Sequence, residues 1–377
     1  MRRYFFIFYV ILAVILLSGA KVAKKGKWRE DPLSRQSSQP FLGFCALCII
    51  LLHIAQAISA VKKETGVLKF MEDLGANFVG FFFFFSGYGL YRSLQDKQEY
   101  MKHFLKNRLP EILIPFYVCN FTFISGSCIG GYQFEKGEFL PYITGWILMN
   151  NQMWYIVEIF ILYLIFYLIF NRVKNMTAAF TMFLAATIGI TFLGLLSGHD
   201  VLTRSRGLWF HGEWWYNSTL LIFIGMLLAR WREPLYAFAR KYYIPLLALG
   251  ILATVMLYHK TCYMLHNIGY WCEWDGYRGY REKLMTLGVQ LPFVIISVVT
   301  VALIFQKVEF GNKVLNFFGE IKLELYLIHN LFILYLPIRT RFYLIIGVYV
   351  AAILLATILH ALDRKLIGIV KKRLPDF

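Results

Sequence analysis

Long apolar runs alternate with short polar segments along almost the whole chain. The apolar residues in each run are continuous, and most runs approach the roughly 20 residues that a helix needs to cross a bilayer. Lipid offers the backbone no hydrogen-bond partners, so continuous runs of this length predict helices. We expect eleven spans, at residues 4–19, 41–60, 75–91, 109–130, 143–170, 176–196, 208–229, 242–259, 284–305, 321–337 and 342–361.

Two of these runs are less regular than the others. The run 143–170 is long enough either to tilt strongly in the bilayer or to begin as a shallow segment. The run 208–229 carries His211, Glu213 and Asn217 in its first half. The pattern therefore defines the boundaries of these two spans least well.

Composition supports the membrane assignment. Hydrophobic residues make up 59% of the 377 residues, and charged residues make up only 16%. No soluble domain, internal repeat or long low-complexity segment interrupts the apolar runs. The sequence therefore predicts an all-α polytopic membrane protein that works inside the bilayer or at its two surfaces.

Lys and Arg residues are distributed unequally between alternate loops. The richer set of loops holds 24 of them and the other set holds 14. The richer set consists of residues 20–40, 92–108, 171–175, 230–241, 306–320 and 362–377. Basic loops stay in the cytoplasm, so we expect an outside N-terminus and a cytoplasmic C-terminus, in the plasma membrane. The net charge of +17 is scattered over separate loops and does not indicate nucleic-acid binding.

The first apolar run has two interpretations. A basic start, an apolar core and small residues at its end are also typical of a cleaved signal peptide. Cleavage would leave a basic segment outside, against the charge bias, so we favour a signal-anchor helix. We therefore expect a signal-anchor helix and basic cytoplasmic loop at 1–40, a ten-helix core at 41–361 and a basic cytoplasmic tail at 362–377.

The six cysteines give little evidence of a metal site. Four of them, Cys45, Cys48, Cys119 and Cys128, lie in spans, where a thiol usually behaves as a small hydrophobe. Cys262 and Cys272 share a predicted outer loop, and a disulfide between them stays open. No group of Cys and His has the spacing of a zinc site, so we expect no metal.

His53 is the clearest polar exception inside a predicted span. It shares a helical stripe with Cys45, Ile49, Gln56 and Ala60, which are small or polar enough to face other helices. A packed histidine bonded to a carbonyl is one interpretation. The other is a general base, because a desolvated imidazole is neutral and can take a proton from an alcohol.

The segment FFFFFSGYG, residues 81–89, places small and polar residues directly after five phenylalanines. Gly80 and Gly87 lie on one helix face and permit close approach of another helix or a ligand. Ser86 places a hydroxyl beside this face, either for packing or to steady a carbonyl oxygen. Arg92 follows where the helix leaves the membrane, either as a topological anchor or as a contact for an anionic ligand.

A second histidine lies inside a span near the end of the chain. Lys322, Tyr326 and His329 fall at spacings of four and three on one helix face, and His329 is about 12 Å from the inner end. His329 can therefore approach the depth of His53. It can take part in proton transfer together with His53, or it can be a structural residue that donates a hydrogen bond to a carbonyl.

Five segments of the core occur in a characteristic order. They are His53, FFFFSGYG (82–89), FLKNRLPEILIPFY (104–117), QMWYIVEIFILYL (152–164) and GEIKLELYLIHNLF (319–332). This order resembles the acyltransferase-3 family of integral membrane O-acyltransferases, and the resemblance covers about 41–361. It implies a ten-helix core with its C-terminus inside.

The resemblance also implies residue roles. His53 matches the family's catalytic histidine, and Arg108 matches the first arginine of the basic pair that is proposed to hold the phosphates of the acyl donor. Tyr326 and His329 match the Tyr and His of the late YLxH element. The expected donor is acetyl-CoA or another acyl-CoA as co-substrate.

The donor contacts depart from the family pattern. Leu42 and Glu111 stand where the family carries arginines, Gly80 where an Asp is common, and Lys322 and Glu324 where serines are usual. Arg92, Lys106 and Lys322 are the candidate substitutes that would contact the donor.

The acceptor is expected on the outer side. Aromatic residues gather in two outer segments, including Trp214 and Trp274, and aromatic faces with nearby carboxylates suit sugars. An ordinary interfacial belt of Trp and Tyr is the alternative. Gln56, beside His53, and Trp154 complete the candidate acceptor contacts.

The resemblance implies an O-acyltransferase that moves an acetyl or short acyl group to a hydroxyl of an envelope or exported glycan or of a lipid-linked sugar. His53 would deprotonate this hydroxyl as it attacks the thioester carbonyl. The rival is a proton-coupled transporter or flippase with His53, His329 and Glu324 as a relay, although no inverted repeat supports it. A non-catalytic receptor or scaffold is a third class, but it would not need two histidines at mid-depth.

Overall fold

The computed structural model describes residues 5–61, 66–197, 216–269, 279–337 and 343–375. The α-helices are α1 (Phe6–Leu17), α2 (Arg35–Ser59), α3 (Lys69–Glu72), α4 (Gly75–Asp96), α5 (Phe104–Ile129), α6 (Phe139–Thr144), α7 (Trp154–Arg172), α8 (Met176–Ser197), α9 (Leu220–Arg230), α10 (Arg232–Lys241), α11 (Tyr243–Asn267), α12 (Tyr280–Phe305), α13 (Lys313–Tyr335) and α14 (Leu344–Arg373). Short 3₁₀ helices cover Gly66–Leu68 and Asn151–Met153. One two-residue antiparallel pair, β1 (Lys21–Val22) with β2 (Val308–Glu309), sets Lys21 opposite Glu309.

The expected all-α polytopic membrane fold is confirmed. Within the described residues, eight helices are long and apolar enough to cross a membrane, and α1 and α9 are shorter apolar helices. The predicted span 321–337 lies in α13, whose apolar sequence is interrupted by charged residues. Each of the eleven runs expected from the sequence therefore corresponds to a helix.

The two irregular runs differ from a single spanning helix. Residues 143–153 are not part of α7, because Gly145 adopts a positive φ of 78° that ends α6. The Asn150 side chain accepts a hydrogen bond from the Gln152 backbone N–H and so begins the next helical turn. In the run 208–229, α9 starts only at Leu220, and residues 208–215 lie outside the described part of the chain.

Several helices extend beyond the spans that the sequence predicts, most of all α11, α13 and α14. Helix α11 continues to Asn267, and α14 continues to Arg373, so most of the basic tail is helical. Residues 232–241, which were expected to be loop, form the amphipathic helix α10. Helix α10 leads directly into α11, which is lined mainly by exposed apolar side chains.

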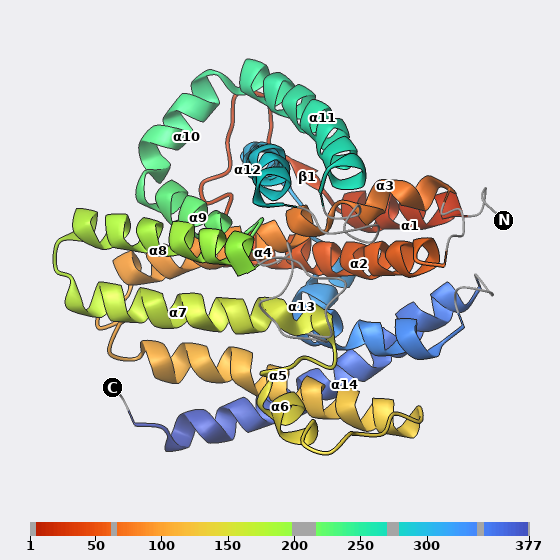
Figure 1. The fold of residues 1–377 in the computed structure, drawn as a ribbon. Helices are drawn as coiled ribbons and strands as arrows, with labels where there is room; N and C mark the ends of the chain where they lie inside the picture. Colours follow the sequence, from red (N-terminus) through yellow and green to blue (C-terminus); the bar gives the residue numbers. More distant parts are fainter. Residues whose placement is uncertain (1–4, 62–65, 198–215, 270–278, 338–342, 376–377) are drawn as a thin grey trace.

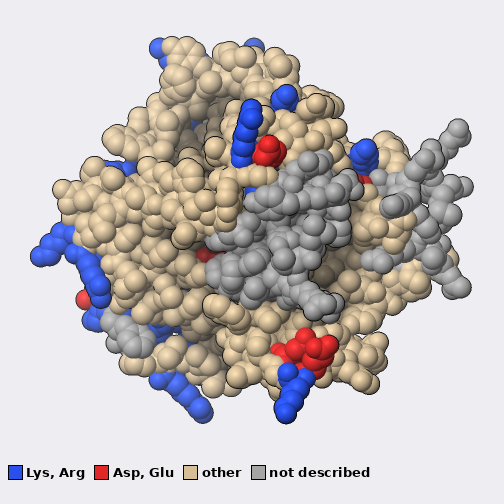
Figure 2. All heavy atoms as spheres, viewed as in Figure 1, with Lys and Arg blue, Asp and Glu red and all other residues tan. Residues whose placement is uncertain are grey.

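Most helices run along one common direction, with α13 near the middle of the bundle and α10, α11 and α12 at one side (Figure 1). The C-terminus, the end of α4 and the start of α5 lie at the left in Figure 1, which we call the C-terminal end of the bundle. The end of α2 and the start of α7 lie toward the opposite end. Figure 2 shows a largely uncharged face in this view, with several Lys and Arg side chains at its left margin.

Two helix crossings depend on glycine. A Cβ atom at Gly87 of α4 would collide with the Ile222 carbonyl of α9, and one at Gly225 of α9 would collide with the Phe84 carbonyl. The small residues after the phenylalanine run therefore allow direct backbone contact between α4 and α9. Of the two partners that the sequence left open for Gly87, a helix or a ligand, the structure has a helix.

The second crossing joins α2 and α13. A Cβ atom at Gly43 would collide with the Gly319 backbone, and one at Gly319 would lie 2.6 Å from the Gln39 carbonyl oxygen. His53 and His329 each follow their own glycine by ten residues, roughly 15 Å along the helix axis. The two helices run in parallel from this crossing, so it sets both histidines at one level.

The N-terminal segment is attached to the core near β2. The Asn312 side chain donates to the Ile15 and Ser18 carbonyls at 2.8 and 2.6 Å. Arg29 donates to the Phe305 and Val308 carbonyls at 3.2 and 3.0 Å. These bonds, together with the β1–β2 pair, hold residues 18–34 along the connection between α12 and α13.

Candidate active site

The two predicted histidines meet in the bundle. His53 Nδ1 of α2 and His329 Nε2 of α13 are 2.7 Å apart, and the two ring planes differ by only 4°. His329 is fully buried, whereas His53 is half-buried. The sequence allowed the two rings to approach in depth, and the structure places them within hydrogen-bond distance.

A backbone contact assigns the protons in this pair. His329 Nδ1 lies 3.1 Å from the Leu325 carbonyl oxygen. A carbonyl only accepts, so Nδ1 of His329 must carry the hydrogen, and Nε2 of a neutral ring is then an acceptor. His53 Nδ1–H therefore donates to His329 Nε2. The remaining nitrogen, His53 Nε2, carries a free lone pair and can act as a base.

Tyr326 lies beside the histidine pair on α13. Its ring centroid is 6.3 Å from that of His329, and the side chain is only 4% exposed. Tyr155 of α7 packs against Tyr326 edge to face, with the centroids 5.9 Å apart. Within the described part of the chain, the buried Tyr326 hydroxyl has no hydrogen-bond partner.

Ser86 and Trp154 line the same region from α4 and α7. Ser86 forms a hydrogen bond with the Tyr155 hydroxyl, so its own hydroxyl is already engaged. The Tyr155 ring packs against Phe83 with the centroids 4.9 Å apart, and Trp154 is buried nearby at 6.4 Å from Phe83. In this arrangement Ser86 and Trp154 hold Tyr155 and the phenylalanine run together.

Glu158 is a buried carboxylate that sequence reasoning did not select. It lies on α7 and is 1% exposed, and its Oε1 accepts a hydrogen bond from the Thr219 hydroxyl just before α9. Its Oε2 is buried without a partner among the described residues. Glu158 also interacts electrostatically with Tyr326 and Tyr155. Glu158 is the single acidic residue of the apolar run 143–170. An acidic residue in such a run is a functional candidate from the sequence alone.

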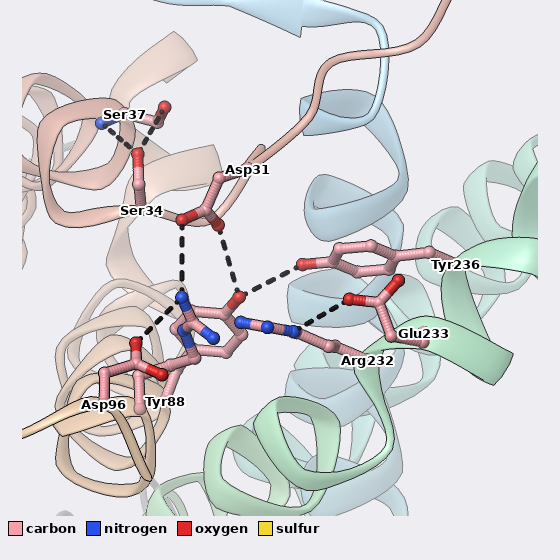
Figure 3. A network of polar contacts seen from close by, with 9 residues as sticks. Asp31, Ser34, Ser37, Tyr88, Asp96, Arg232, Glu233 and Tyr236 are labelled. Atoms are coloured by element: carbon pink, nitrogen blue, oxygen red, sulfur yellow. Dashed lines mark hydrogen bonds and ion pairs between the residues drawn. The ribbon is translucent and has the colours of Figure 1, made fainter. Parts of the chain in front are cut away.

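Arg92, a candidate donor contact, is paired by acidic residues. Its guanidinium lies 2.9 Å from Asp96 and 3.9 Å from Asp31 of the N-terminal segment. The Tyr88 hydroxyl donates to Asp31 at 3.5 Å and is 3.3 Å from the Tyr236 hydroxyl (Figure 3). Burial raises the pKa of Tyr236 on α10 above its ordinary value, so this hydroxyl stays protonated. Arg92 therefore belongs to a network of ion pairs and hydrogen bonds, although its buried Nη1 has no hydrogen-bond partner among the described residues.

The other candidate donor contacts lie near the start of α5 and on α13. Arg108 Nε donates to the Tyr100 hydroxyl at 3.1 Å, and Lys322 Nζ donates to the Gly319 carbonyl at 2.7 Å. Lys106 is half-buried in the first turn of α5. The Lys322 ammonium has three donor hydrogens, of which the Gly319 carbonyl takes one.

Glu111, which replaces an arginine of the family pattern, holds the C-terminal helix. Its two oxygens accept from Arg364 at 3.2 Å and from Lys371 at 2.6 Å, both on α14. The altered residue therefore joins α5 to α14.

Glu324 faces away from the histidine pair. Its Oε1 is 2.9 Å from His360 Nδ1 on α14, and the fully buried Asp363 lies beside it. The three groups form a cluster between α13 and α14. The relay of His53, His329 and Glu324 that the transporter hypothesis invokes is therefore not contiguous through direct contacts of the described residues.

The remaining sequence candidates are placed as follows. Gln56 donates to the Glu72 carbonyl at 2.8 Å, so its amide holds the segment that follows α2. Trp214 and Trp274 lie outside the described residues, as does Cys272. Cys262 on α11 carries a free thiol. Among the described residues, no group of three or more His, Cys, Asp or Glu side chains is arranged to hold a metal ion.

A cavity of about 310 Å³ opens between α5, α6 and the end of α13. It is lined by Phe123, Ser127, Tyr132, Tyr142, Leu148, Met149, Asn151, Leu334 and Tyr335. Leu334 and Tyr335 follow His329 by five and six residues, roughly 8 to 9 Å along α13. The cavity therefore lies farther from the C-terminal end than the histidine pair.

A family model described as an acyltransferase domain matches residues 43–362. The chain belongs to this acyltransferase family. The matched part of the acyltransferase contains the histidine pair, Tyr326, Glu158 and both glycine crossings, but not α1 or the segment that leads to Asp31. Searches among curated proteins and solved structures find no match to the chain.

Proposed function

We propose that the protein is a membrane O-acyltransferase that moves an acetyl or short acyl group from cytoplasmic acyl-CoA to a hydroxyl. The acceptor would be an envelope or exported glycan or a lipid-linked sugar. One observation carries the proposal: a His–His pair with a free basic nitrogen lies inside a membrane acyltransferase domain. No metal is needed for this chemistry.

The reaction follows from the tautomers of the pair. His53 Nε2 takes the proton of the acceptor hydroxyl while the oxygen attacks the thioester carbonyl. The resulting tetrahedral centre breaks its C–S bond, and the proton on His53 passes to the departing CoA sulfur. A positioned base of this kind typically contributes about 10²- to 10⁴-fold to the rate.

His329 supports His53 in this step. When His53 gains a proton, its Nδ1–H bond to His329 Nε2 becomes charge-assisted and therefore stronger. The Leu325 carbonyl keeps His329 in the tautomer that accepts this bond. His329 thus orients the base and stabilises its charged form.

The two substrates would approach from opposite ends of the bundle. The C-terminal end holds Lys106, Arg108 and Lys322, whose positive charges suit the phosphates of acyl-CoA. The aromatic cavity toward the other end offers tyrosine faces and hydroxyls to a sugar ring. This assignment places the C-terminus in the cytoplasm, as the distribution of Lys and Arg predicts.

The test is transfer of label from acetyl-CoA to a crude envelope extract by the purified protein in nanodiscs. We expect turnover by the unsubstituted protein and a loss of at least about 100-fold in His53→Ala. The matched control is His259→Ala, which removes an exposed histidine on α11 and should leave the rate unchanged. Absence of both turnover and acyl-CoA binding in the unsubstituted protein would contradict the proposal and favour transport.

A further inference from the structure

Two unpaired polar atoms lie on and near Tyr326, which packs beside His329. Glu158 Oε2 is an acceptor, the Tyr326 hydroxyl is a donor, and neither has a hydrogen-bond partner in the described part of the chain. Both side chains are more than nine-tenths buried. They interact electrostatically with each other but do not form a hydrogen bond.

Each of the two side chains is fixed by contacts with other residues. Thr219 binds the other oxygen of Glu158, and Ser86 engages the Tyr155 hydroxyl. The Tyr326 ring is fixed by its packing against Tyr155 and Phe82, with centroids 5.9 and 6.4 Å away. Buried polar groups in folded proteins are normally paired, so an unpaired donor and acceptor beside a reactive centre indicate a ligand group that binds both.

A hydroxyl is the simple group that satisfies both atoms. It donates its hydrogen to a carboxylate oxygen and accepts from a phenol through its own oxygen. The acyl thioester offers only acceptors, which suit Tyr326 but not Glu158. The hydroxyl that is acylated must face His53 Nε2, so the hydroxyl at Glu158 is a second one on the same acceptor.

We propose that Glu158 and Tyr326 bind a second hydroxyl of the acceptor and thereby select polyols over simple alcohols. This inference rests on the proposed acyl transfer and assigns Glu158 as a specificity-determining residue. Glu158 lies one turn into α7, whose start is remote from the C-terminal end of the bundle (Figure 1). An acceptor that arrives from that side reaches Glu158 without passing the donor.

The experiment titrates a crude envelope extract against labelled acetyl-CoA in nanodiscs for Glu158→Gln. The Gln carbonyl keeps the hydrogen bond from Thr219. Its NH₂ group then replaces the oxygen that faced the ligand, so the ligand hydroxyl loses the acceptor for its hydrogen. Loss of a hydrogen bond to the buried carboxyl group should raise the half-saturating amount of extract by roughly two- to tenfold. The half-saturating acetyl-CoA concentration should change less than about twofold.

Two further variants keep the result interpretable. Tyr326→Phe removes only the hydroxyl and should also raise the half-saturating amount of extract. Because both residues bind one ligand group, the double variant should not show the product of the two effects. Glu324→Gln is the matched control, because Glu324 is an equally buried carboxylate with one unpaired oxygen that faces α14. It should leave extract saturation unchanged.

Each outcome separates the inference from the function it rests on. If the unsubstituted protein transfers label but Glu158→Gln and Tyr326→Phe saturate with the same amount of extract, the second-hydroxyl site is wrong and acyl transfer stands. If Glu158→Gln instead changes the half-saturating acetyl-CoA concentration, Glu158 contacts a pantetheine amide of the donor. That result would also overturn the inference. No transfer by the unsubstituted protein counts against the proposed function itself.

Discussion

The polar groups at the C-terminal end of α4 and those in the centre of the bundle differ in how completely they are paired. At the end of α4, Arg92 is bonded by Asp96 and approached by Asp31, and Tyr88 contacts both Asp31 and Tyr236. In the centre, Glu158 Oε2 and the Tyr326 hydroxyl lack partners among the described residues, and His53 Nε2 keeps a free lone pair. The groups at the end of α4 are largely paired within the chain, with Arg92 Nη1 left without a hydrogen bond among the described residues, whereas in the centre a carboxyl oxygen and a hydroxyl both lack partners.

This contrast indicates where ligands bind. Asp31 and Asp96 are about half-exposed, so their pairs with Arg92 compete with water and contribute little, typically about 0 to 1 kcal/mol. A buried unpaired group has no water to replace its partner and therefore costs about 1 to 3 kcal/mol. Clustered cations are thus a weaker sign of a substrate site here than unpaired atoms in the core.

The largest effect should come from separating the helices that hold the centre. Gly43→Val forces a side chain into the Gly319 backbone, and overpacking of this kind typically destabilises by about 1 to 3 kcal/mol. The 2.7 Å contact between the histidines should be lost, with transfer of label reduced at least about 100-fold. Gly189→Val, at a position with no atom within 4 Å among the described residues, is the control. Equal rates in the two variants would contradict the role of the crossing.

A smaller loss is expected when only the partner of the base is changed. His329→Phe keeps a ring in the buried space but removes the acceptor for His53 Nδ1–H. We expect the transfer rate to fall by about 10- to 100-fold, less than in His53→Ala, because His53 Nε2 remains. Single-turnover kinetics with labelled acetyl-CoA measure this step. An unchanged rate would reduce His329 to a packing residue.

The smallest effect is predicted for Arg92. Arg92→Gln should change the half-saturating acetyl-CoA concentration less than about threefold, because Asp96 and Asp31 already pair with the Nη2 atom of Arg92. Arg108→Gln, on the neighbouring helix α5, should raise that concentration more. The half-saturating concentration is measured by titrating acetyl-CoA at a fixed amount of extract. A larger increase in Arg92→Gln than in Arg108→Gln would place the donor site at the end of α4 and contradict the difference between the two regions.

The helices were predictable from sequence, because the continuous apolar runs depend on the bilayer and not on neighbouring helices. Residues 143–153 differ from the prediction because Gly145 and Asn150 break the helix locally, although the run is apolar. The depth of His53 and His329 also followed from spacing, whereas their hydrogen bond depends on the Gly43–Gly319 crossing. Their catalytic roles stay predictions.

Other features of the centre required tertiary structure. The sequence cannot indicate that Gly87 packs against α9, that Leu325 sets the tautomer of His329, or that Asp31 approaches Arg92 from outside the family domain. These contacts join segments whose pairing depends on how the helices cross. Glu158 was visible as a lone acid in an apolar span, but its unpaired oxygen was not.

The most direct test of the account is a double-mutant cycle on the histidine pair. Transfer of label from acetyl-CoA to envelope extract is measured for His53→Ala, His329→Phe and the double variant, each checked for folding by thermal unfolding. If His329 acts only through His53, the double variant should be no slower than His53→Ala, because residues that work as a unit are not additive. A double variant slower than His53→Ala by the full His329→Phe factor would show that the two histidines act independently and would contradict the account.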